Sequence, residues 1–151
     1  MKKVNISALL LFLTAAVLLA GEKDTVSIPE GGSGTDTLVI NARLVEIGAI
    51  PSNDIYNYVF IMKYRVISVV KGQFEGKEIL VGHYNPLVAR NRVKGEMDKF
   101  ISGDVEAFKT GTKHKLTLVS PLEVIWDGAV EDEYIDDESP RYFALKADLI
   151  E

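Results

Sequence analysis

Polar and apolar residues alternate over residues 57–71, with the sequence NYVFIMKYRVISVVK. The even positions are mostly apolar, whereas the odd positions include Lys63, Arg65 and Lys71. Successive side chains of a strand point to opposite faces, so this period of two predicts a long strand with one face on a core. Because the segment exceeds the usual strand length, we expect the strand to bend or to carry a bulge.

Other extended segments are rich in β-branched residues and are bounded by glycine or proline, which is typical of strands. The clearest are residues 38–48, 77–84, 113–124 and 141–150, and residues 104–108 alternate more weakly. The glycines of KGQFEG (residues 71–76) predict a hairpin turn, whereas residues 86–100 allow a short helix, an ordered loop or both. Five or six strands with at most one or two short helices favour an antiparallel sandwich or small barrel.

The amino-terminal residues have the three zones of an export signal. Lys2 and Lys3 precede an apolar run over residues 8–19, and Ala20 and Gly21 offer a small-residue cleavage site. The run is too short for a membrane-spanning helix, so we expect a cleaved signal peptide at residues 1–20, with an uncleaved anchor as the alternative. Residues 21–37 are rich in Gly, Ser, Thr and acidic residues and predict a flexible leader before one domain at residues 38–151.

Composition limits the chemistry that is available. Signal cleavage leaves 151 − 20 = 131 residues, enough for one domain with its own core. The chain has no cysteine, which excludes disulfides, thiol nucleophiles and thiolate metal sites. Removing two lysines takes the net charge from −5 to −7, which argues against a nucleic acid partner. A secreted or periplasmic protein without a stable membrane anchor is expected.

Several turn residues resemble a known group. The segment YVFIMKYRVISVVKGQFEGKEILV and the later FKTGTKHKLTL are similar to netrin-like domains and tissue inhibitors of metalloproteinases. Lys71, Gly72, Phe108 and Gly111 match the turns of that group. The resemblance implies a five-stranded antiparallel Greek-key barrel of the oligonucleotide/oligosaccharide-binding (OB) type. It does not imply protease inhibition, because the inhibitors use an amino-terminal cysteine and disulfides that this chain lacks.

Two histidines and two serines are candidates for catalysis. His83 in VGHYNP follows a predicted strand, where an imidazole can act as acid, base or ligand, or can fix the turn by bonding a loop carbonyl. His114 between Lys113 and Lys115 is expected on a solvated strand face. Neither Ser102 nor Ser120 has a Gly-x-Ser-x-Gly setting, so no acyl transfer is indicated.

The acidic stretch DGAVEDEYIDDE (residues 127–138) is a candidate calcium site, since Ca²⁺ takes six to eight oxygen ligands. It fails the helix-loop-helix template, because Ala129 stands at the third position and Asp132 at the sixth. Any site would be irregular, and the alternative is a solvated acidic loop. No other cofactor is expected. The candidate ligands are Asp127, Asp132, Asp136 and Asp137.

Aromatic and basic residues near the predicted strand ends form a candidate binding surface. Such platforms bind sugars or peptides, although the single tryptophan is equally suited to closing the core. The candidate binding residues are His83, Tyr84, Arg90, Arg92, Trp126 and Tyr134.

The sequence favours a non-enzymatic exported module that binds a protein or glycan outside the cytoplasm. One alternative is a small hydrolase or metal-dependent enzyme that uses His83, which requires Asp127 or Asp132 nearby. Another is a structural role in the cell envelope, with the leader as a tether.

Overall fold

The structure is a computed structural model that describes residues 37–52, 54–95 and 97–151. The expected signal peptide and all of the expected leader except Thr37 lie outside these residues. Among the described residues, no helix has the length and apolar character needed to cross a membrane.

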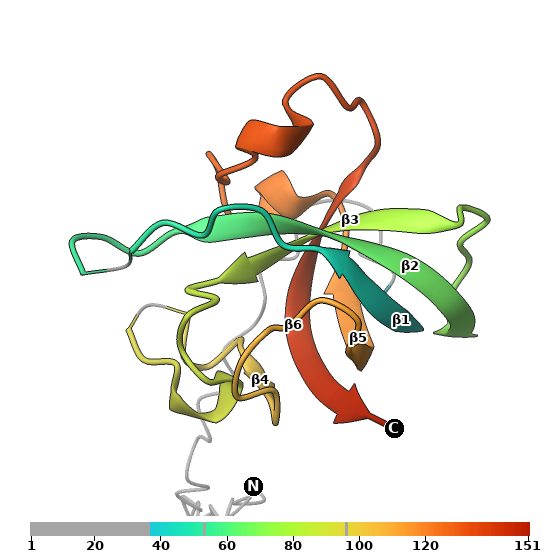
Figure 1. Cartoon of the computed structure of the whole chain (residues 1–151), viewed down its shortest axis with the longest axis horizontal. Helices are drawn as coiled ribbons and strands as arrows, with labels where there is room; N and C mark the ends of the chain where they lie inside the picture. Colours follow the sequence, from blue (N-terminus) through green and yellow to red (C-terminus); the bar gives the residue numbers. More distant parts are fainter. Residues whose placement is uncertain (1–36, 53, 96) are drawn as a thin grey trace, which may run out of the picture. The chain divides into compact units, whose positions relative to one another are not determined.

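The fold is mainly β, as the alternation predicts (Figure 1). Three 3₁₀-helices of three residues each, one more helix than expected, complete the regular structure of the described residues: η1 (Arg90–Arg92), η2 (Leu122–Val124) and η3 (Asp132–Tyr134). The six strands are β1 (Leu38–Glu46), β2 (Val59–Lys71), β3 (Glu78–Tyr84), β4 (Ser102–Gly103), β5 (Lys113–Val119) and β6 (Arg141–Ile150).

The sheet is mixed, so the expected purely antiparallel arrangement is wrong. The strand order is β3-β2-β1-β5-β6-β4, and β3 also pairs with β6. Each neighbouring pair from β3 to β6 in this order is antiparallel, so β3 and β6 point the same way and can pair only in parallel. They do so from Leu80 opposite Arg141 to Gly82 opposite Phe143, and β4 pairs with β6 in parallel as well.

The long second strand carries the irregularities that its length predicts. Its register with β1 shifts at three points. Two of these shifts leave Ile67 and Val70 of β2 without an opposite residue on β1, and both are about half exposed. β2 therefore bends along β1 while it also pairs with β3 as far as Arg65 opposite Glu78.

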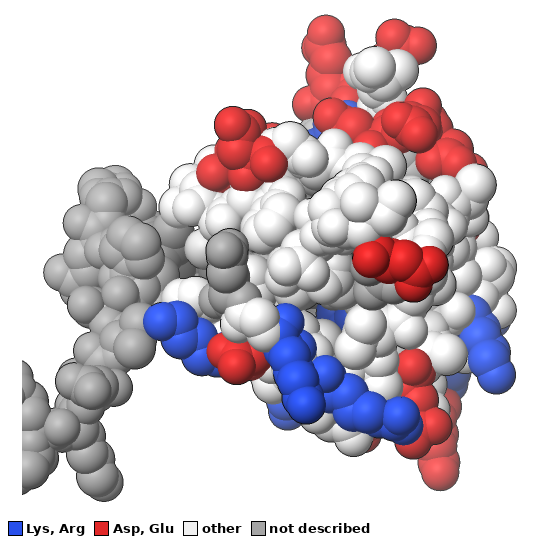
Figure 2. Space-filling view, turned by 90° about the vertical axis from the view of Figure 1, so that its left-hand side faces the viewer, with Lys and Arg blue, Asp and Glu red and all other residues white. Residues whose placement is uncertain are grey.

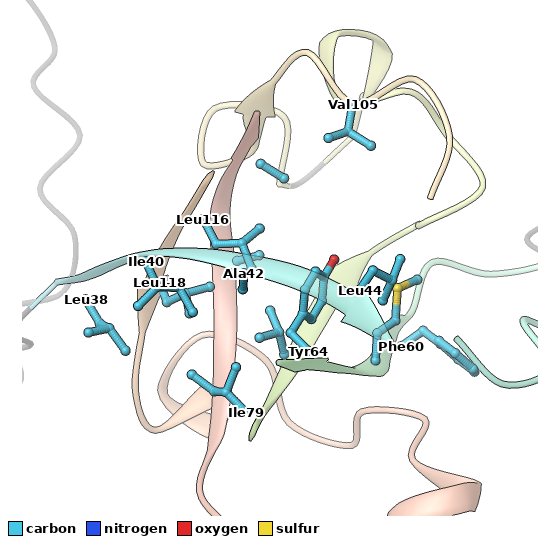
Figure 3. Close-up of a cluster of buried hydrophobic side chains, with 14 of the residues drawn as sticks. Leu38, Ile40, Ala42, Leu44, Phe60, Tyr64, Ile79, Val105, Leu116 and Leu118 are labelled. Atoms are coloured by element: carbon cyan, nitrogen blue, oxygen red, sulfur yellow. The ribbon is translucent and has the colours of Figure 1, made fainter. Parts of the chain in front are cut away.

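Alternate residues of the strands form a buried core on one face of the sheet. Leu38, Ile40, Ala42 and Leu44 project from β1, and Figure 3 shows their side chains among those of β2, β3 and β5. Tyr64 lies in this core with its ring fully buried. The alternation of β1 is therefore the pattern of a strand with one face on a core.

A second apolar cluster lies on the opposite face of β2 and β3. Val59, Ile61 and Leu80 point into it, and Met97 and Leu122, from the segments after β3 and β5, pack on it. Because both faces of β2 are covered here, its first four residues are all buried and apolar.

Gly103 marks a close approach between β4 and β6. A Cβ atom there would lie 1.9 Å from the carbonyl oxygen of Ala147, and its φ is +123°. We expect Gly103→Ala to destabilise the domain by about 2 kcal/mol more than Gly111→Ala. Gly111 also has a positive φ, but a Cβ there would meet nothing within 4 Å, so it isolates the clash. Urea unfolding of both variants measures the difference, and equal losses would contradict the packing argument.

Candidate functional site

The exit of β3 is fixed by Asn85 and Arg90. Asn85 adopts a positive φ of 41°, and its side chain accepts a hydrogen bond from the backbone nitrogen of Tyr58 at 3.1 Å. The buried guanidinium of Arg90 donates to the carbonyl oxygens of Tyr84, Asn85 and Val88 at 2.7–2.8 Å. These bonds fix the conformation of residues 83–86, with the sequence HYNP. The turn at His83 is thus fixed by its neighbours rather than by the imidazole.

His83 lies inside the core rather than at the surface. Its Nε2 atom shares a hydrogen bond of 3.0 Å with the hydroxyl of Tyr64, not with a loop carbonyl. Its ring lies 4.4 Å from the ring of Phe108, centroid to centroid. Within the described residues its Nδ1 atom has no hydrogen-bond partner.

His114 is also buried, so the expectation of a solvated strand face is wrong. It alternates with Lys113 and Lys115, but its side chain takes the inward position on β5. Its Nε2 atom lies 3.1 Å from the hydroxyl of Thr112, and its ring contacts the rings of Tyr64 and Phe108. Because His114 stands between two lysines, the sequence pattern did not indicate that its side chain points into the core.

Burial keeps both imidazoles neutral. It lowers the pKa of His83 well below its usual value, and the positive charge of Arg90 and repulsion from a protonated His114 lower it further. It lowers the pKa of His114 to about 4, against a smaller opposite effect of Asp104. The same burial raises the pKa of Tyr64 well above its normal value.

The enzyme alternative receives no support from this arrangement. It needs a carboxylate near His83, but among the described residues the hydrogen bond and ring contacts of His83 involve Tyr64 and Phe108. Asp127 and Asp132 are exposed, whereas His83 is fully buried. A general acid or base must reach its substrate, and this imidazole is sealed in the core.

The expected aromatic platform is largely internal. Tyr84, Arg90 and Tyr134 are buried, and only Arg92 is exposed. Half-buried Trp126 packs edge-on against Tyr84 at 5.3 Å between centroids, so it helps to close the second cluster. The six predicted binding residues therefore do not form one accessible surface.

The four predicted metal ligands do not assemble. No group of three or more histidine or acidic side chains in the described residues is placed to hold a metal ion. Asp137 instead accepts a hydrogen bond from the backbone nitrogen of Ser139 at 2.8 Å, and Ser139 lowers the pKa of this carboxyl. Figure 2 shows acidic side chains gathered at the top of the molecule, where Figure 1 places this segment.

Arg141 donates several hydrogen bonds to the acidic segment. It donates to the carboxylate of Glu131 at 2.8 Å and to the carbonyl oxygen of Tyr134 at 2.7 Å. It also donates to the carbonyl oxygens of Asp137 and Ser139. One guanidinium therefore bonds four points of residues 131–139 and offsets part of their charge. Arg141 was not among the residues predicted to be functional, because its sequence position indicates only the start of a strand.

A groove of about 300 Å³ lies beside this segment, and we call it the β3 groove. Phe74 and Tyr142 meet edge to face along it, with ring centroids 6.0 Å apart. A Cβ on Gly76 would lie 2.7 Å from the Phe74 ring, so a side chain there would displace that ring. The lining residues are Lys63, Phe74, Gly76, Glu78, Ile79, Leu80, Asp137, Ser139, Pro140 and Tyr142.

Sequence reasoning missed the β3 groove, although one signal was present. Phe74 is an apolar residue in the polar turn GQFEG, where no core contact is required. The sequence indicates only that Tyr142 lies in a strand. Its position beside β3, opposite Val81, follows from the β3–β6 pairing. The groove therefore depends on contacts between distant segments.

Comparison with known proteins gives no relative: no family model, curated protein or solved structure matches this chain significantly. The resemblance to netrin-like domains stays a prediction.

Burial of the histidines predicts a loss of stability in acid. The pKa of His114 is about 4 in the folded protein and about 6.5 when unfolded, so between these values the unfolded chain binds the extra proton. Stability is complete above about pH 6.5 and falls toward pH 4, by at most about 1.4 kcal/mol per pH unit for each histidine. Thermal unfolding at pH 7.0 and 5.0 should show a smaller drop in Tm for His114→Gln than for the wild type. Equal drops would contradict this origin.

The role of Arg141 predicts local loosening when the guanidinium is removed. Lysine cannot reach four acceptors at once, so Arg141→Lys should lower the opening free energy of residues 131–139 by about 1–3 kcal/mol. Hydrogen exchange of these amides should speed up about fivefold or more. Arg65→Lys is the control, because Arg65 makes one exposed ion pair, with Glu78 at 3.4 Å. Unchanged exchange in Arg141→Lys would rule out the role.

Proposed function

We propose that this chain is exported and that residues 38–151 form a non-enzymatic binding module for a protein or glycan outside the cytoplasm. The observation that carries this proposal is the β3 groove, with its aromatic pair and charged rim. The sealed position of His83 supports binding rather than catalysis.

We further propose that the sheet is an OB-type Greek-key barrel. The pairings run β1-β2-β3-β6-β5 and return to β1, which supports a closed five-stranded arrangement. OB folds bind oligonucleotides and oligosaccharides on the face of their second and third strands and on adjoining loops. The β3 groove includes residues of β2, β3 and the β5–β6 connection, which matches that location.

The lining of the groove indicates what it holds. The half-buried Phe74 and Tyr142 supply apolar surface, whereas Lys63, Glu78 and Asp137 supply charged hydrogen-bonding groups. Ligand sites are typically apolar with a few such polar groups, and a volume of about 300 Å³ lies at the small end of their range. The groove therefore suits one or two sugar units, or one side chain of a protein partner.

The test is binding of neutral oligosaccharides and short peptides to the full chain by calorimetry. We expect one class to bind saturably, and Phe74→Leu to weaken that binding tenfold or more because the aromatic face is lost. Phe100→Leu is the control, since Phe100 is also half-buried but does not line the groove. Equal effects of the two variants would place the ligand elsewhere. Turnover of a panel member that His83→Ala abolishes would overturn the proposal.

A further inference from the structure

Cationic side chains gather on the outward face of β1, β2, β5 and β6, although the whole chain is acidic with a net charge of −5. Strand register places Arg43 on β1 directly between Arg65 on β2 and Lys113 on β5. The inward neighbours Ala42 and His114 are buried, so these three side chains share the outer face. Three cations therefore stand in one row across three adjacent strands.

Two further rows extend this surface, which we call the cationic face. The second row places Asn41 between Ser68 and Lys115, and a hydrogen bond of 3.1 Å from Asn41 to Ser68 confirms the shared face. The third row places Val39 between Lys71 and Thr117, with Lys146 next along. The cationic face comprises Arg43, Arg65, Lys71, Lys113, Lys115 and Lys146.

Carboxylates compensate only part of this charge. Glu78 pairs with Arg65 at 3.4 Å and Asp148 with Lys146 at 2.7 Å, and Asp104 also acts on Lys146. The other four cations make no ion pair with the described residues. Like charges directly opposite each other on neighbouring strands destabilise a sheet. The row through Arg43 thus carries an electrostatic cost that a bound anion relieves.

We propose that the cationic face binds an anionic polysaccharide. Adjacent strands lie about 4.8 Å apart, so one row places three cationic side chains within about 10 Å, of which Arg65 is paired with Glu78 and Arg43 and Lys113 are not paired with any described residue. Asn41, Ser68 and Thr117 lie between or beside the cations and offer hydrogen bonds to sugar hydroxyl groups. This site is separate from the β3 groove, and the proposal does not depend on that function.

The composition of the face favours a sugar polymer over a single-stranded nucleic acid. The three rows contain no aromatic residue. Single-stranded nucleic acids are bound by stacking their bases on aromatic side chains, in addition to charge contacts. A polysaccharide bearing sulfate, phosphate or carboxylate groups needs only the cations and the neutral polar groups that this face presents.

The experiment measures binding of dextran sulfate to the full chain in 50 mM salt. Arg43→Gln combined with Lys113→Gln should weaken binding tenfold or more. Arg92→Gln combined with Lys94→Gln is the matched control, since it removes one exposed arginine and one exposed lysine elsewhere. The control should lose less than threefold, and Phe74→Leu should lose nothing, which separates this site from the groove.

The same variants have a stability readout. The Arg43→Gln and Lys113→Gln pair relieves like-charge repulsion, so its Tm should equal or exceed that of the wild type. Lost binding then cannot reflect unfolding. Absence of dextran sulfate binding by the wild type, or equal losses in the two double variants, would overturn the proposal. Tighter binding of a thymidine 20-mer through the same residues would also overturn it, in favour of nucleic acid.

Discussion

The three residue pairs between β3 and β6 are the constraint on which the rest of the arrangement depends. β3 and β6 are far apart in the sheet order. Their pairing gives each strand a hydrogen-bonded neighbour along those residues, which would otherwise form exposed strand edges. Gly82 sits in this pairing because a Cβ there would lie 2.3 Å from Leu122. Arg141, at the start of the same pairing, bonds the acidic segment. The β3 groove forms where this junction meets the β2–β3 turn.

Segregation of charge is the second organising feature. Before β6, Arg141 bonds the carboxylate of Glu131 and backbone carbonyl oxygens of the acidic segment, whereas the cations of β1, β2 and β5 lie together on the outer sheet face. Figure 2 shows one side of the molecule, where acidic side chains gather at the top and basic and acidic side chains are mixed lower down. The net charge of the whole chain is a sum over the acidic segment and the cationic face, so it indicates neither region. The chain is acidic as a whole, yet one face is suited to an anionic partner.

The core illustrates how polar residues are used inside a β fold. His83, His114 and Arg90 surround Phe108, and the charge of Arg90 disfavours a proton on His83 in this cluster. Neutral imidazoles can be buried at moderate cost when one nitrogen is bonded, as with Tyr64 and Thr112 here. Sequence context did not indicate this cluster, because His114 stands between two lysines and His83 before an asparagine and a proline.

Among the described residues, the sequence by itself determined five of the six strands and most of their bounds, whereas residues 104–108, predicted to be extended, form no strand and the short β4 precedes them. Residues 141–150 were predicted as a strand in full, and β1 and β2 end within two residues of their predicted limits, because alternation and glycine act locally. The tertiary structure alone decided the parallel pairing of β3 with β6, the burial of His114, the hydrogen bonds of Arg141 to the acidic segment and the row through Arg43. Each depends on which strand lies beside which, and pairing register between distant segments is not encoded in the period of any one of them.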